Sequence, residues 1–239
     1  MDQIEQHLTD LRLYGMKRQW QSLIEMKEHH KLSLSEGLAL LLQYEMEDKE
    51  NRRFDRLHRQ AKFRYTASIE EFSYEPERGL NKEVIIRLAT GDYLQKGEAV
   101  LITGATGCGK SFIASGLGKN ACSQGYKVKY YNFLKLMSEL NLARIDGTIH
   151  KQLNQIAKLD LLIIDDFGIA HLDQRQQLDL MEIIEDRHGK KATIIASQLP
   201  VKSWHEMIGE ATIADAILDR LIYSSHRIKL DGKSLRKKV

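Results

Sequence analysis

Cysteine and proline are both scarce in this chain of 239 residues, with two of each. Neither Cys108 nor Cys122 has a partner at the spacing of a metal site, and two cysteines do not make a disulfide framework. A reducing, cytoplasmic setting fits this cysteine usage best. The scarcity of proline favours a helix-rich architecture with short connections.

Long apolar runs are also missing. No uncharged stretch approaches the roughly 18–20 residues that a membrane span needs, and residues 1–5 lack the basic start and apolar run of a signal peptide. We therefore expect a soluble protein with no membrane partner. Hydrophobic residues make up 42% of the chain and charged residues 29%, which provides enough apolar material for a core and argues against disorder.

Charge of one sign is nearly balanced by the other: the net charge is +3, from 36 basic and 33 acidic side chains. Basic residues nevertheless gather in two segments. The first contains Arg52, Arg53, Arg56, Arg59, Lys62 and Arg64, and the second contains Lys229, Lys233, Arg236, Lys237 and Lys238. Both segments favour contact with a polyanion, and the candidate DNA contacts are Arg52, Arg53, Arg56, Arg59, Lys237 and Lys238. A solvated helix face is the open alternative for the first segment.

Residues 1–65 are predicted to form a small all-α N-terminal domain. Apolar residues recur at helical spacing within residues 4–24 and again within residues 38–46. Ser33 precedes Glu36 by three residues, which is the spacing of a capping box at the start of a long helix. Residues 66–98 indicate a connector with turn chemistry and one short helix at residues 82–89.

From residue 99 onward, short β-rich runs alternate with helical stretches. The predicted strands are residues 99–103, 127–132, 161–165, 193–197 and 227–230. Strands that alternate with helices indicate a parallel sheet covered on both faces. The sequence thus predicts an α/β domain over residues 66–239.

The segment GATGCGKS matches the phosphate-binding pattern G-x-x-x-x-G-K-[ST], between a predicted strand and a predicted helix. Its glycines allow a tight loop whose bare N–H groups meet phosphate oxygens at a helix N-terminus. Lys110 is expected to reach the β- and γ-phosphates, and the Ser111 hydroxyl to bind Mg²⁺. The predicted ATP-binding residues are Gly104, Ala105, Thr106, Gly107, Cys108, Gly109, Lys110 and Ser111.

The segment LLIIDDFG ends an apolar strand in two adjacent carboxylates, Asp165 and Asp166. A phosphate-loop NTPase needs an acid at the end of a second strand, which binds the Mg²⁺ complex. We assign that role to Asp165. Side chains alternate along a strand, so Asp166 need not point the same way, and we predict that it activates water as a general base. A solvent-exposed turn with two acids is the alternative.

These two segments, together with TIIASQLPVKSWHE and AILDRLIYSSHRIKLDGKSLRK, resemble IstB-type transposition helper ATPases of bacterial insertion sequences. Those proteins are relatives of the helicase loader DnaC and the initiator DnaA within the AAA+ class. The resemblance covers essentially the whole chain. It implies a P-loop NTPase (AAA+) domain with a five-stranded parallel sheet, preceded by a small helical domain, with a C-terminal lid that is absent or vestigial.

The resemblance also implies roles for single residues. Ser197 and Gln198 are the candidate sensors of the γ-phosphate or the attacking water. Arg236 is a candidate for the further sensor arginine that AAA+ lids carry.

Arg220 matches the position of an arginine finger, and Arg227 is the second choice. A finger acts on a neighbour's ATP, which requires a homo-oligomer with ATP at the subunit interfaces. The alternative is a helix-surface arginine paired with Asp219 or Asp215.

In the family that this chain resembles, ATP drives assembly on double-stranded DNA, and the assembly recruits and stimulates a transposase. Without a helix-turn-helix or zinc-finger pattern, we expect salt-dependent contacts to phosphates and no base readout. Many AAA+ relatives carry Glu where this chain has Asp166, so hydrolysis is expected to be slow and dependent on assembly. The alternatives are a DnaC-like replicative helicase loader and a nucleotide-binding scaffold with negligible turnover.

Overall fold

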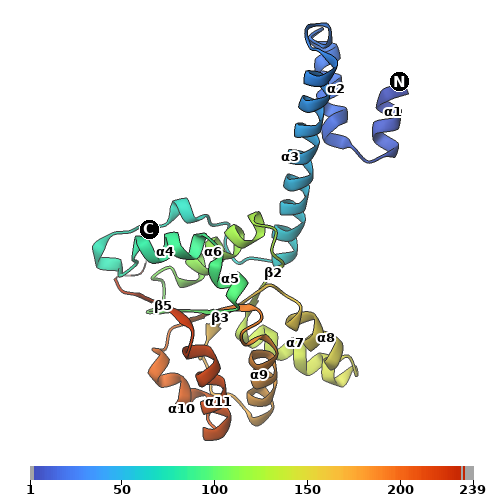
Figure 1. The fold of residues 1–239 in the computed structure, drawn as a ribbon. Coiled ribbons are helices and arrows are strands. Elements are labelled where there is room, and N and C mark those ends of the chain that lie inside the picture. Colours follow the sequence, from blue (N-terminus) through green and yellow to red (C-terminus); the bar gives the residue numbers. More distant parts are fainter. Residues whose placement is uncertain (1–2, 233, 235–239) are drawn as a thin grey trace. The chain divides into compact units, whose positions relative to one another are not determined.

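The computed structural model describes residues 3–232 and 234 (Figure 1). The chain divides into two compact units, Met1–Arg56 and Leu57–Val239, so the division falls within the long helix α3 (Leu34–Ala61). The domain boundary near residue 65 remains a prediction.

The N-terminal unit is helical, as predicted, and consists of α1 (Gln3–Asp10), α2 (Tyr14–Glu25), the 3-10 turn His29–Lys31 and the first part of α3. The predicted capping box is present. The Ser33 N–H donates to Glu36 Oε2 at 2.8 Å, and the Glu36 N–H donates to Ser33 Oγ at 3.3 Å.

Polar contacts hold α2 against α3. The N–H groups of Gly15 and Met16, in the first turn of α2, donate to Glu45 Oε2 at 2.7 and 3.1 Å. Glu45 is 3% exposed, so its carboxylate serves as a buried counter-charge for the positive end of α2. By contrast, Leu38 and Met46 of the predicted apolar stripe are 50% and 64% exposed.

The second unit contains a sheet of five parallel strands in the order β2–β3–β4–β1–β5, which confirms the predicted architecture. The strands are β1 (Ala99–Gly104), β2 (Val128–Asn132), β3 (Leu161–Phe167), β4 (Ala192–Ser197) and β5 (Ser225–Leu230). Residues Leu161–Asp165 of β3 are fully buried, as expected for a central strand with helices on both faces.

The helices cover the two faces of the sheet as separate layers (Figure 1). One layer contains α4 (Lys82–Ala89), α5 (Asp92–Lys96) and α6 (Lys110–Ser123). The other contains α7 (Phe133–Ile145), α8 (Ile149–Ala157), α9 (Gln174–Arg187), α10 (Trp204–Ile208) and α11 (Ala211–Ile222). None of the helices in the described part of the chain is long and apolar enough to cross a bilayer.

The connector before the sheet docks on α6 through two aromatic rings. A Cβ atom at Gly116 would lie 2.6 Å from Phe72 Cζ, and one at Gly118 would lie 2.5 Å from Phe63 Cε1. These glycines therefore let the connector approach the helix closely. Phe63 therefore packs against α6.

Arg187, at the end of α9, is 1% exposed and hydrogen-bonds to residues of α8 and β4. Its Nη1 donates to the carbonyl oxygens of Ile156 at 2.7 Å and Leu159 at 2.9 Å, and its Nε donates to Thr193 Oγ1 at 3.1 Å. Burial lowers the pKa of Arg187 to about 10, because the charged form loses solvation. The hydrogen bonds to the backbone carbonyl oxygens at the end of α8 and before β3 offset this loss of solvation.

Candidate nucleotide-binding site

The phosphate loop lies between the end of β1 and the start of α6, as predicted. Gly107 and Gly109 have φ angles of +82° and +102°, which L side chains rarely adopt. At Gly104 a Cβ atom would clash with the Leu230 carbonyl oxygen of the neighbouring strand β5. The glycines of the pattern are therefore required by this loop's geometry.

Lys110 is 6% exposed and folds back over the loop. Its Nζ donates to the carbonyl oxygens of Gly104 and Ala105, both at 2.8 Å. The ammonium group therefore lies at the mouth of the loop, beside the N-terminus of the 14-residue helix α6. A cation and a helix N-terminus together favour an anion at this position.

A β-bulge in β3 presents both carboxylates of the pair. Ile164 pairs with Ile195, but Phe167 pairs with Ser197, so β3 has one residue more than β4 over this interval. Asp166 takes a φ of +58°, in the left-handed region that Asp tolerates better than most residues. The strict alternation assumed from the sequence fails here, and Asp165 and Asp166 contact the same cation.

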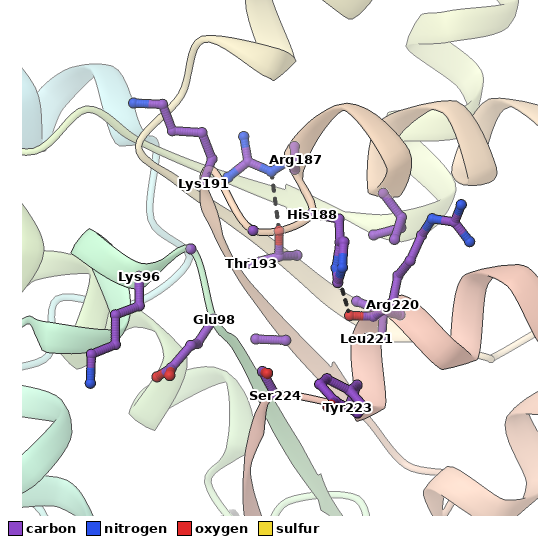
Figure 2. A pocket seen from close by; sticks show the side chains of 14 residues that line it. Lys96, Glu98, Arg187, His188, Lys191, Thr193, Arg220, Leu221, Tyr223 and Ser224 are labelled. Carbon is purple, nitrogen blue, oxygen red and sulfur yellow. Dashed lines mark hydrogen bonds between the residues drawn. The ribbon is translucent and has the colours of Figure 1, made fainter.

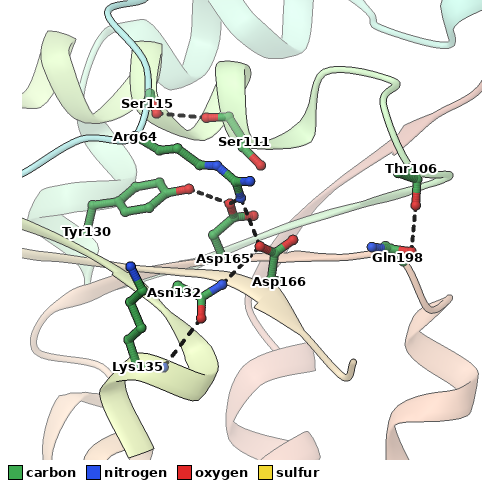
Figure 3. Close-up of polar contacts among 10 residues, drawn as sticks. All are labelled: Arg64, Thr106, Ser111, Ser115, Tyr130, Asn132, Lys135, Asp165, Asp166 and Gln198. Carbon is green, nitrogen blue, oxygen red and sulfur yellow. Dashed lines mark hydrogen bonds and ion pairs between the residues drawn. The ribbon is translucent and has the colours of Figure 1, made fainter. Parts of the chain in front are cut away.

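That cation is Arg64, from the connector that follows α3 (Figure 3). Its Nη1 lies 2.8 Å from Asp166 Oδ2 and 3.4 Å from Asp165 Oδ2. Asn132 Nδ2, at the end of β2, also donates to Asp166 Oδ2 at 2.9 Å. Partial burial opposes the charge of Arg64, but the hydrogen bond to Asp166 and the nearby negative charges raise its pKa, so it stays charged.

Tyr130 binds the other acid of the pair. Its hydroxyl donates to Asp165 Oδ2. Burial, together with the charge of Asp165, raises the pKa of Tyr130, so the hydroxyl remains a proton donor. Asp165 is fully buried, and its Oδ1 has no hydrogen-bond partner among the described residues.

This donor set fits a magnesium ion. Mg²⁺ takes hard oxygen ligands and is usually held by one or two carboxylates together with substrate phosphates. The unpartnered Asp165 Oδ1 and the Ser111 hydroxyl are ligand or water-binding groups of that kind. Among the described residues there is no cluster of three or more His, Cys, Asp or Glu side chains that could hold a metal alone.

Two cavities meet at the phosphate loop. The first, of about 390 Å³, is lined by Arg64, Tyr65, Thr106, Gly107, Gly109, Lys110, Ser111, Phe112, Asp166, Ile169 and Gln198. The second, of about 240 Å³, shares Gly109 and Phe112 with the first and is walled by apolar side chains that include Phe72, Leu80 and Leu230. A polar cavity that adjoins an apolar one suits a ligand with an anionic end and an aromatic end.

The two candidate sensors differ in position. Gln198 lines the first cavity, and its Oε1 accepts a hydrogen bond from Thr106 Oγ1 at 2.7 Å (Figure 3). Ser197 is fully buried. Its Oγ donates to the Phe167 carbonyl at 2.7 Å and accepts from the Leu199 N–H at 3.1 Å. Gln198 therefore contacts the phosphate loop, whereas the Ser197 hydroxyl bonds to backbone groups near the ends of β3 and β4.

Arg220 lies away from the phosphate cavity of its own chain. It lines a different cavity of about 240 Å³, next to the residues that precede β1, β4 and β5 (Figure 2). Its guanidinium forms an ion pair with Glu185 and donates to the Ala216 carbonyl at 2.8 Å. The observed partner Glu185 differs from the anticipated Asp215 and Asp219, and Asp215 Oδ1 lies 3.2 Å from His205 Nε2.

The candidate DNA contacts are placed unevenly. Arg52 is paired with Glu45 at 3.2 Å and with Asp48 at 2.6 Å, so part of its charge is neutralised. Arg53, Arg56 and Arg59 are exposed, and so is Arg227 on β5. Arg236, Lys237 and Lys238 lie outside the described residues.

Sequence reasoning missed three residues of the site: Arg64, Tyr130 and Asn132. Arg64 was counted only as the last member of a basic segment. A signal for the other two existed, because β2 ends at Asn132 and the carboxyl ends of adjacent parallel strands share one edge of the sheet.

The fold and the phosphate loop define the class: this is a P-loop nucleotide-binding protein whose five-stranded parallel sheet has the AAA+ fold. The described structure resembles the DnaC helicase loader, with a TM-score of 0.57 and 16% identity, covering 70% of this chain and 98% of that one. It also resembles the replication initiator DnaA bound to AMPPCP and single-stranded DNA, with a TM-score of 0.58 and 20% identity, covering 72% of this chain and 53% of that one.

The chain belongs to the family of IstB-like ATP binding proteins, whose family model matches residues 6–239. It is 41% identical to the putative insertion sequence ATP-binding protein y4pL of Sinorhizobium fredii, over 96% of this chain and 94% of that protein. The family predicted from the sequence motifs is therefore confirmed.

We predict that Tyr130→Phe lowers the free energy of unfolding by about 2 kcal/mol, because the buried Asp165 carboxylate loses a hydrogen-bond donor. Urea unfolding without nucleotide would measure the loss. The control is Tyr131→Phe, at the next residue of the same strand. Equal losses for the two variants would contradict a specific role for the Tyr130 hydroxyl.

Proposed function

We propose that this protein is an ATP-dependent DNA-binding regulator that assembles on double-stranded DNA without sequence specificity and recruits and stimulates a transposase. The observation that carries the proposal is a phosphate loop that lines one cavity together with Asp166 of the carboxylate pair, in a chain of the IstB-like family. The relative y4pL is described as an insertion sequence ATP-binding protein, which supports a role in transposition.

In this proposal the triphosphate of ATP lies along Gly104–Ser111, with Lys110 at the β- and γ-phosphates. The aromatic base occupies the apolar cavity beside Phe72 and Leu80, which adjoins the loop. Mg²⁺ would be held by Ser111 and, through Asp165, by the end of β3, and it would supply positive charge to the phosphates. The unpartnered Asp165 Oδ1 supports this assignment.

Asp166 is the proposed general base. It takes a proton from the attacking water as the water oxygen bonds to the γ-phosphorus and the bond to the ADP oxygen breaks, giving ADP and phosphate. Gln198 lines the same cavity and would orient that water or contact the γ-phosphate. Asp166 is already engaged by Arg64 and Asn132, and it is one methylene shorter than Glu, so hydrolysis would be slow until the contact with Arg64 is broken.

We predict that Asp166→Asn retains ATP but hydrolyses it about 10²–10⁴-fold more slowly, because the amide cannot accept the proton. Lys110→Ala should lose nucleotide binding itself. The measurements are ATP affinity by a fluorescent analogue and phosphate release, with Asp146→Asn as a control on an exposed helix end. Unchanged hydrolysis in Asp166→Asn would mean that another group is the base.

Arg220 is the proposed arginine finger, which acts on ATP held by a neighbouring copy of the chain. Its position outside its own phosphate cavity supports this reading, since a finger serves the adjacent subunit. In the single chain Glu185 holds the guanidinium, and assembly would have to exchange that partner for phosphate. ATP at the subunit interfaces of a homo-oligomer follows from the proposal.

Arg220→Ala is predicted to bind ATP normally but to lose hydrolysis in the assembled state by about 10³-fold. Glu185→Gln, which removes the ion pair and keeps the arginine, should retain hydrolysis. Phosphate release from mixtures of wild-type and Arg220→Ala chains would show whether the arginine acts on a neighbour. Normal turnover by assembled Arg220→Ala would refute the finger assignment.

DNA contact would be made through phosphates, with Arg53, Arg56 and Arg59 as the exposed candidates of the described part of the chain. The related DnaA is bound to single-stranded DNA in its structure, and this fold likeness is compatible with a nucleic-acid role. The two free, buried cysteines suit the reducing cytoplasm in which we place the protein.

Duplex binding is predicted to be stronger with ATP than with ADP and to fall steeply with salt, with a log–log slope of about −0.9 per phosphate neutralised. Fluorescence anisotropy on two unrelated duplexes at several salt concentrations would measure both effects. Duplex binding of equal strength with ATP and with ADP, and at all salt concentrations, would refute the proposal.

A replicative helicase loader is the second candidate, favoured by the likeness to DnaC. Its ATP chemistry would be the same, so the partner decides between the two. Co-purification with a transposase or with a hexameric helicase separates them, and phosphate release with and without DNA separates both from a scaffold with negligible turnover.

A further inference from the structure

Arg64 occupies an unusual position for a surface arginine of a connector. It reaches the ends of both carboxylates of the candidate metal site, 2.8 Å from Asp166 Oδ2 and 3.4 Å from Asp165 Oδ2 (Figure 3). Its side chain is 40% exposed, whereas the side chains of Asp165 and Asp166 are 0% and 20% exposed. The cation therefore comes from the solvent side and covers the acids.

Two adjacent carboxylates at the end of a buried strand repel each other, and a positive partner offsets that repulsion. In the described structure Arg64 is the ion-pair partner that both acids share. A magnesium ion that uses Asp165 would place its charge beside the same two carboxylates. A guanidinium and a divalent cation repel each other at that distance, so the two cations compete for one position.

The surroundings allow Arg64 to leave. Arg64 lines the cavity that also contains Lys110 and Ser111, so its side chain can turn from the carboxylates toward the place of the phosphates without crossing the core. Asp165 Oδ2 keeps the Tyr130 hydroxyl after the exchange, and Asp166 Oδ2 keeps Asn132 Nδ2. The acids would therefore stay oriented when the arginine is replaced.

We propose that Arg64 is the counter-ion of the carboxylate pair in the nucleotide-free protein and that Mg²⁺ must displace it to enter the site. Arg64 is thus a positioning residue that sets how much Mg²⁺ the site needs. The inference rests on the proposed function of this cavity as a magnesium–ATP site. It makes metal entry and release of the arginine a single event.

The first test uses Mg²⁺ alone, without nucleotide, and measures the midpoint of thermal unfolding. In wild type Mg²⁺ should have little effect, because Arg64 already neutralises the acids. Arg64→Gln should unfold at a lower temperature in EDTA and be stabilised by millimolar Mg²⁺. Arg175→Gln, an exposed arginine of α9 that loses the same charge, should behave as wild type. Absence of a magnesium effect in Arg64→Gln would overturn the proposal.

The second test titrates Mg²⁺ at a fixed concentration of a fluorescent ATP analogue. Arg64→Gln should lower the Mg²⁺ concentration for half-maximal binding by about tenfold, the size of one charge-assisted hydrogen bond. Arg64→Lys keeps the charge and should restore the wild-type midpoint. A midpoint that is unchanged or higher in Arg64→Gln would show that the arginine does not compete with the metal. Equal behaviour of the lysine and glutamine variants would also refute it.

The two failures are distinguishable. If neither wild type nor variant binds the analogue at any Mg²⁺ concentration, the proposed nucleotide function fails, while the unfolding test with Mg²⁺ alone still reports on Arg64. If wild type binds the analogue with Mg²⁺ and the midpoint does not depend on residue 64, the inference about Arg64 fails alone.

Discussion

Two neighbouring carboxylates at the end of a fully buried strand are the constraint on which the rest of the site depends. The apolar residues of β3 keep this strand in the interior of the sheet, and Asp165 is buried with them. Their negative charge has to be balanced where the strand ends, by hydrogen bonds, by a guanidinium or by a metal. The Tyr130 hydroxyl and the Arg64 guanidinium supply this balance. The bulge at Asp166 brings the second carboxylate within reach of the same guanidinium.

The order of the strands then determines what else can reach the pair. Because β3 lies between β2 and β4, and β4 lies beside β1, the carboxyl ends of four strands share one edge. That edge collects Asn132 from β2, Gln198 after β4 and the phosphate loop after β1. The parallel sheet thus brings residues that are far apart in sequence together around one cavity. The cavity lies at the carboxyl ends of the strands, where open α/β sheets bind ligands.

Arg220 lies next to the residues that precede β1, β4 and β5, away from this edge, and its ion pair with Glu185 gives it a partner within its own chain. The two ends of the strands therefore differ: the phosphate loop and the carboxylate pair lie at the carboxyl ends, and Arg220 lies near the amino ends. In the N-terminal unit, polar contacts to Glu45 hold the helices while several apolar residues of α3 remain exposed.

The sequence alone determined the alternation of strands and helices, the phosphate loop and the acidic end of β3, because each is a local pattern with a local physical cause. Glycines shape a loop from within, and apolar runs predict buried strands wherever they occur. It could not give the bulge that turns Asp166 beside Asp165, since strict alternation is the rule a bulge breaks. Nor could it show that Arg64 pairs with Asp166, 102 positions away, or that Gln198 and not Ser197 reaches Thr106. Such contacts are decided by how the connector and the strands pack, and only the tertiary structure contains that information.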